Sequence, residues 1–180
     1  MKKVIIISLG IIGIIFLILI GISKYSWSDD ITINSKANLL SSLELMQKQL
    51  TTKYPSTAEE VMFEYTELLR FQYTQKSDEE IIEQSIPLMR GFYAKELLAL
   101  NAKERQIELL KEDVAKCQAE KNYLVDSRLV ETDYPDDDTV FIIIEHNFVS
   151  GTLYKEYKLI KEEEEWKLYN WHDIVIPIIN

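Results

Sequence analysis

The longest run of apolar residues lies near the N-terminus of the chain. Residues 4–22 read VIIISLGIIGIIFLILIGI and include no charged side chain. A helix needs about 20 mostly apolar residues to cross the hydrocarbon core of a bilayer, so this run predicts one transmembrane helix. The rest of the sequence has no second run of this kind. We therefore expect a single-pass membrane protein that contacts the lipid bilayer through residues 4–22.

The residues that flank this run predict its orientation. Lys2 and Lys3 precede it, whereas only Lys24 follows it closely. Positive charge favours the cytoplasmic side, so we expect a cytoplasmic N-terminus and an extracytoplasmic C-terminal domain at the cell membrane. Tyr25 and Trp27 follow where amphipathic rings prefer the headgroup layer, and the five flanking residues form the predicted membrane interface. The alternative is a cleaved signal peptide, but the run is longer than a usual signal core and no A-x-A pattern follows it.

Beyond a polar stretch that suits a short stalk, the apolar residues recur at helical spacing. This pattern is typical of amphipathic helices that bury one face. Ser56 and Glu59 fit a capping box at the start of one helix, and Ser77 begins another in the same way. Pro87 is expected to kink or split the helix in which it lies. We predict three or four helices, at about residues 38–51, 57–75, 78–99 and 102–119.

After about Lys121 the apolar period changes from 3.6 to 2, which is the period of strands. Helices followed by an antiparallel meander indicate an α+β domain with helices packed on a sheet of about four strands. The predicted strands lie at about residues 124–132, 139–149, 153–161 and 165–173. The predicted organisation is a cytoplasmic end (1–3), a transmembrane helix (4–22), a stalk (23–36) and an extracytoplasmic domain (37–180).

Three segments carry a resemblance to a known family. They read YPSTAEEVMFEYTELL, SDEEIIEQSIPLMRGFYAKELLALN and KEEEEWKLYNWHDI, between about Tyr54 and Asp173. This part resembles an uncharacterised family of bacterial membrane-anchored proteins with a nuclear-transport-factor-two-like, or cystatin-like, ectodomain. The resemblance implies a cone-like domain, in which helices lie against a strongly curved antiparallel sheet. It implies no activity that could be carried over to residues of this chain.

Charge and motifs narrow the classes of function. The chain holds 30 acidic and 20 basic residues, and all the acids but only 17 of the bases lie from Ser28 onward. The outer part therefore carries about −13, which opposes binding to nucleic acid or to anionic lipid. The one cysteine, Cys117, cannot form an internal disulfide and fits a helical packing position. No motif predicts a catalytic residue, a metal site or a cofactor.

One histidine is the best candidate for chemistry. His146 interrupts an otherwise apolar face of the second predicted strand and, with Ile144 and Phe148, is placed on the concave side of the sheet. It can act as a polar group in a ligand pocket. It can equally be a neutral core histidine bonded to a tyrosine or to the backbone.

Two functions of different classes remain. The first is a non-enzymatic interaction or scaffold module of the bacterial envelope, which assembles with another envelope protein or with itself. The second is a small-ligand-binding or enzymatic domain that uses the concave face of the sheet. A pocket lined by His146 and two further polar groups would favour the second function, whereas a cone filled by Phe and Tyr would favour the first.

Overall fold

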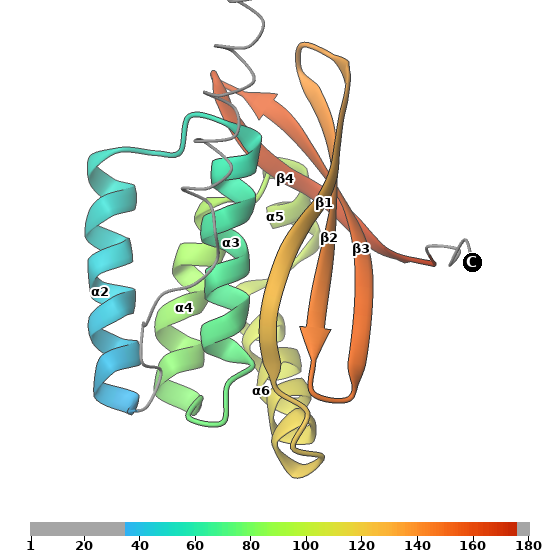
Figure 1. The fold of residues 1–180 in the computed structure, drawn as a ribbon. Helices are drawn as coiled ribbons and strands as arrows, with labels where there is room; N and C mark the ends of the chain where they lie inside the picture. The colour runs from blue at the N-terminus through green and yellow to red at the C-terminus, as the bar shows by residue number, and fades with distance from the viewer. Residues whose placement is uncertain (1–34, 176–180) are drawn as a thin grey trace, which may run out of the picture. The chain divides into compact units, whose positions relative to one another are not determined.

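A computed structural model of the protein describes residues 35–175, which form an α+β domain (Figure 1). The predicted membrane segment 4–22 and the interface residues Lys2, Lys3, Lys24, Tyr25 and Trp27 lie outside the described residues. Among the helices within 35–175, none is long and apolar enough to cross a membrane.

Five helices precede four strands in the described part of the chain. The helices are α2 (Lys36–Thr52), α3 (Ala58–Gln72), α4 (Glu79–Gly91), α5 (Lys95–Leu100) and α6 (Lys103–Ala119). The strands are β1 (Leu124–Asp136), β2 (Thr139–Phe148), β3 (Gly151–Glu162) and β4 (Glu165–Ile174).

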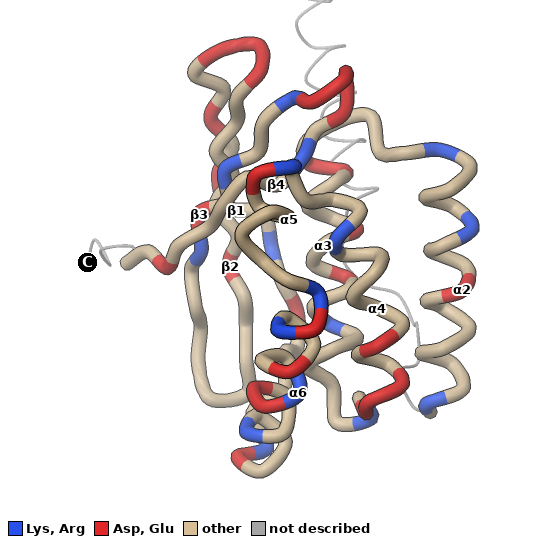
Figure 2. The backbone as a smooth tube through the Cα atoms, turned by 180° about the vertical axis from the view of Figure 1, so that it is seen from behind, with Lys and Arg blue, Asp and Glu red and all other residues tan. Residues whose placement is uncertain are grey.

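The four strands form one antiparallel sheet in the order β1-β2-β3-β4, as the predicted meander requires. Pairing of β2 with β3 is regular from end to end. Both edge strands have bulges or irregularities, three in the β1 pairing and one between Lys158 and Leu159 in the β4 pairing. Bulges bend a strand and increase its twist, and Figure 1 shows the sheet strongly twisted with the helices on one side of it. Acidic residues gather at the tip of the β1–β2 hairpin and at the β3–β4 turn (Figure 2).

Helix α3 begins one residue later than the predicted capping box. Thr57 is the N-cap, its side chain accepts from the amide of Glu60, and the Glu60 side chain accepts from the Thr57 amide. Ser56 supports the same carboxylate with its amide and its hydroxyl. The pairing of Ser56 with Glu59 was wrong because Thr57 also fits the capping pattern, with Glu60 three residues on. Similarly, Asp78 and not Ser77 caps α4.

The single helix predicted over 78–99 is two helices. Pro87 lies inside α4 without ending it, and the helix stops at Gly91. The break follows because the next residues bond to β4: the Leu168 amide donates to the carbonyl of Phe92 (2.7 Å), and the Ala94 amide donates to the carbonyl of Leu168 (2.9 Å). A backbone that pairs with a strand in this way cannot continue its helical bonds.

The core lies between the sheet and the first helices. On β2, Val140, Ile142, Ile144 and His146 are buried, which confirms the predicted alternation. Helices α3 and α4 supply most of the opposing apolar groups, whereas α2 packs on α4 (Figure 1). Helix α6 buries only Val114 among its residues. Helix α6 is therefore attached only loosely to the core.

Candidate functional site

A cavity of about 1050 Å³ opens between α6, the end of α3 and the inner face of the sheet. It exists because the helices that border it bury little here: Leu109 of α6 and Leu100 at the end of α5 both line the cavity yet remain 46% and 83% exposed. Small-molecule sites in proteins typically have volumes of about 300–1,000 Å³ and mostly apolar walls with a few polar groups. The size of this cavity fits that class.

His146 lies at the cavity, as one of the two sequence interpretations requires. Its Nδ1 is 2.8 Å from Oγ of Ser127, and its Nε2 is 2.7 Å from the hydroxyl of Tyr157. Burial lowers the pKa of His146 to about 4, and the neighbouring Lys155 adds to this effect while Asp173 opposes it. The imidazole is therefore neutral at pH 7, bonded to a tyrosine as a core histidine would be, and also part of the cavity wall.

The two other predicted pocket residues differ in their positions. Phe148 lines the cavity and is partly buried. Ile144 faces the same side of the sheet but is buried in the core and is not part of the cavity wall. Of the three predicted pocket residues, His146 and Phe148 therefore lie at the cavity.

Aromatic rings form one wall of the cavity. The centroids of Tyr65 and Tyr157 are 5.9 Å apart, and Trp171 lies 6.1 Å from Tyr93 and 6.5 Å from Tyr157. Burial raises the pKa of Tyr65, Tyr93 and Tyr157, so these phenols stay protonated and able to donate. The Tyr93 hydroxyl accepts from Nε2 of Gln106 at 3.0 Å. Such a wall suits flat or apolar ligands with polar substituents.

The charged side chains that line the cavity all have partners. Lys155 pairs with Asp173 at 2.5 Å, and Arg105 pairs with Glu108 at 2.5 Å. The Asp113 carboxylate accepts from the Tyr73 hydroxyl at 2.5 Å. Because both signs of charge occur and each has a neighbour, the cavity offers no concentrated charge to an ionic ligand. A neutral molecule is the better fit.

Gln72 brings an amide to the cavity from the last turn of α3. The residue is fully buried, and its Nε2 donates to Oγ of Ser85 (2.9 Å) and approaches Sδ of Met89 (2.7 Å). Its Oε1 has no hydrogen-bond partner among the described residues. Most buried polar atoms in proteins are paired, so an unpaired one beside a cavity is informative.

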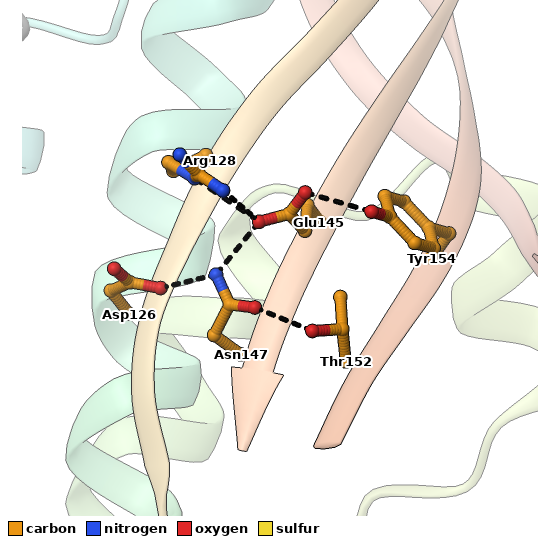
Figure 3. A network of polar contacts seen from close by, with 6 residues as sticks. All are labelled: Asp126, Arg128, Glu145, Asn147, Thr152 and Tyr154. Atoms are coloured by element: carbon orange, nitrogen blue, oxygen red, sulfur yellow. Dashed lines mark hydrogen bonds and ion pairs between the residues drawn. The ribbon is translucent and has the colours of Figure 1, made fainter. Parts of the chain in front are cut away.

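The opposite face of the sheet carries a separate polar network (Figure 3). Glu145, which neighbours His146 but points the other way, accepts from Arg128, from Asn147 (2.8 Å) and from the Tyr154 hydroxyl (2.9 Å). These bonds lower the pKa of Glu145, and the bond from Arg128 has the largest effect. The network links β1, β2 and β3, and of its six residues only Thr152 also lines the cavity. Its main role is therefore to fix the sheet.

Sequence reasoning missed most of the cavity wall. Gln72 was detectable, because it falls on the buried face of α3 one turn after Leu68 and two turns after Tyr65. Tyr65, Tyr93 and Tyr157 gave no signal beyond an abundance of aromatic residues. Cys117 lines the cavity and is half-buried, and burial raises the pKa of its thiol.

Comparison with known proteins identifies the family. Residues 1–171 match the family described as "Domain of unknown function (DUF6715)". The chain belongs to this family. A search of curated proteins finds no match.

Similar solved structures are distant from this member of the DUF6715 family. A DUF4783 family protein from Bacteroides ovatus is 14% identical with a TM-score of 0.33, and the match covers 43% of this chain and 64% of that protein. A Campylobacter jejuni protein described as an NTF2-like transpeptidase is 13% identical with a TM-score of 0.43, over 64% of this chain and 99% of that one. A designed β-sheet protein is 10% identical with a TM-score of 0.30, over 74% and 88%.

Proposed function

We propose that this protein is a membrane-anchored extracytoplasmic module that binds a small, neutral, largely apolar molecule in the cavity between α6 and the sheet. The observation that carries the proposal is the open cavity itself, with a volume of about 1050 Å³ and a wall that contains His146. Gln72 and Tyr157, which both carry polar groups, belong to the same wall. These features meet the criterion that favours a ligand-binding domain over a scaffold whose cone is filled by aromatic side chains. We also propose that the domain is a nuclear-transport-factor-two-like cone. The order of its elements, helices followed by a bulged antiparallel meander, supports this.

The membrane anchor rests on the sequence. Residues 4–22 are long and apolar enough to span a bilayer, and the lysines before them favour a cytoplasmic N-terminus. The family match begins at residue 1, so the apolar run belongs to the region that the family shares. We expect the protein in the membrane fraction, with its C-terminal domain cut by protease added outside the cell. A soluble protein, or a C-terminal domain protected in intact cells, would contradict the anchor or its orientation.

Binding without catalysis is the simpler form of the proposal. His146 is neutral and has both ring nitrogens engaged, by Ser127 and by Tyr157. Ser127 is not part of the cavity wall, so it is not placed to attack a ligand. The residues at the cavity are thus suited to holding a molecule by shape and hydrogen bonds.

The experiment is an analysis of small molecules that copurify with the full-length protein from its native membranes. Cys117→Trp adds a large side chain at the cavity wall, and Cys117→Ala is the matched control that adds none. Mass spectrometry of organic extracts should find a compound enriched with the wild type and with C117A, and depleted with C117W. Equal recovery from all three proteins, or no enriched compound, would contradict the proposal.

An envelope scaffold is the second candidate, and one observation favours it. The edge strand β1 exposes Val125 (59%), Leu129 (41%) and Val130 (47%). An exposed edge strand with apolar side chains can pair with a strand of another protein. Crosslinking of the full-length protein in membranes tests this role: a partner crosslinked at β1 in the wild type should be lost when Val125 and Val130 are both changed to Lys.

A further inference from the structure

We infer that the cavity recognises a molecule that carries a hydroxyl group, and that Oε1 of Gln72 accepts the hydrogen bond from that group. The inference rests on the proposed function and adds the chemical class of the ligand. It is carried by two polar groups at the cavity whose hydrogen-bonding capacity is left unused inside the protein.

The first group is the carboxamide oxygen of Gln72. Among the described residues, three buried side-chain atoms have no hydrogen-bond partner: Nε of Arg70, Oε1 of Gln72 and Oγ of Ser77. Only Gln72 belongs to the cavity wall. A buried acceptor left unsatisfied costs about 1–3 kcal/mol, so a site that keeps one beside an open cavity gains when a donor enters.

The orientation of the Gln72 amide follows from its neighbours. Ser85 donates its own hydroxyl proton to the carbonyl of Ile82 (3.0 Å), so its Oγ is left as an acceptor. The sulfur of Met89 is also only an acceptor. Both atoms are close to Nε2, at 2.9 Å and 2.7 Å, so the NH₂ group points to them and the oxygen is the part of the amide left without a partner. An amide turned the other way would place its oxygen against two acceptors.

The second group is the hydroxyl of Tyr157, through its contact with His146. A neutral imidazole has one donor nitrogen and one acceptor nitrogen. If Nδ1 carried the proton, the hydroxyl proton of Ser127 would have no acceptor on the histidine. Ser127 is buried and lies outside the cavity wall, so nothing in the cavity could accept that proton instead. If Nε2 carries the imidazole proton, Ser127 donates to Nδ1 and Nε2 donates to Tyr157, so the unused proton is that of Tyr157. The second arrangement costs less because Tyr157 lines the cavity, where a ligand or water can accept.

The cavity wall also holds other polar residues, such as Asn101, Asn122 and Ser150. Gln72 contributes the one buried side-chain acceptor of the wall that has no partner among the described residues, and Tyr157 contributes a hydroxyl proton that the protein does not use. A hydroxyl group both donates and accepts, whereas an ether or a ketone only accepts and a hydrocarbon does neither. No unpaired charge competes for the ligand, since Lys155, Arg105 and Asp113 are each engaged. A neutral aromatic or alicyclic alcohol or phenol matches this set of groups.

The test uses two probes of similar shape, 2-naphthol, which has a hydroxyl donor, and 2-methoxynaphthalene, which has none. Cys117 is the one cysteine of the chain and lines the cavity, so slower alkylation of its thiol by iodoacetamide reports occupancy. The full-length protein and its Gln72→Met variant are compared by intact mass under identical conditions. Because partition of the probes into detergent is the same for both proteins, the quantity to compare is the ratio of the two half-protecting concentrations.

The ratio is the half-protecting concentration of 2-naphthol divided by that of 2-methoxynaphthalene. We expect this ratio to be about tenfold lower in the wild type than in the Gln72→Met variant. An equal ratio in both proteins, with both probes protective, would overturn the role of Gln72 and leave the proposed function standing. No protection by either probe would contradict both. If the Gln72→Met variant does not melt cooperatively, the Tyr157→Phe variant supplies the test, with 2-acetylnaphthalene (a ketone) and 2-isopropenylnaphthalene (a hydrocarbon) as the probes. We expect the wild type to prefer the ketone and the Tyr157→Phe variant to lose this preference. An unchanged preference in the variant would overturn the inference.

Discussion

The buried histidine predicts a measurable pH dependence of stability. Burial lowers the pKa of His146 to about 4 in the folded protein, whereas an unfolded chain has a histidine pKa of about 6.5. Below about pH 6.5 the unfolded state binds a proton that the folded state does not, so acid stabilises the unfolded state. Stability from this group is complete at neutral pH and is lost as the pH falls toward 4. Between about pH 7 and pH 5 the loss amounts to about 2 kcal/mol.

The assay is urea unfolding of the full-length protein at both pH values, compared with His146→Gln. Other groups also titrate, including Glu145, whose lowered pKa makes it lose stabilising bonds in acid, but they are present in both proteins. Lys155 and Asp173, the charged groups that act on His146, are likewise unchanged. We expect H146Q to lose about 2 kcal/mol less than the wild type on acidification. Equal losses in H146Q and the wild type would refute a buried neutral histidine.

Two further predictions concern stability away from the cavity. Glu145→Gln removes the charge that accepts hydrogen bonds from side chains of β1 and β3, and it should lower the free energy of unfolding in urea by about 1 kcal/mol. The control Glu44→Gln, at an exposed position, should not change it. Equal effects of the two substitutions would contradict a structural role for the network. Thr57→Ala removes the N-cap of α3 and should cost about 1 kcal/mol in the same assay, while Thr52→Ala at the exposed end of α2 should cost less. A Thr57 variant as stable as the Thr52 variant would contradict the capping assignment.

The elements of the fold were predictable because they depend on local pattern. The change of apolar period near Lys121 indicated the order of helices and strands, and the alternation along β2 indicated its buried face. The break between α4 and α5 was not predictable. It depends on bonds from Phe92 and Ala94 to Leu168, which lies far away in the sequence. Pro87, the local signal for a break, lies within a continuous helix.

The cavity was less accessible to sequence reasoning than the fold. His146 was detectable as a polar residue on an apolar strand, and Gln72 gave the same kind of signal on α3. Whether such a residue meets protein or open space depends on how closely α6 approaches the sheet. That distance is set by packing among helices, since α6 packs on α4 and buries only Val114. Periodicity alone carries no information about it.

The central claim, that the cavity under α6 holds a small molecule, is tested most directly by the alkylation rate of Cys117. The rate is measured by intact mass in the full-length protein with increasing 2-naphthol, with fully unfolded protein as the control for the reagent. We predict saturable slowing in the folded protein and none in the unfolded one. A rate that does not change with 2-naphthol in the folded protein would contradict the account.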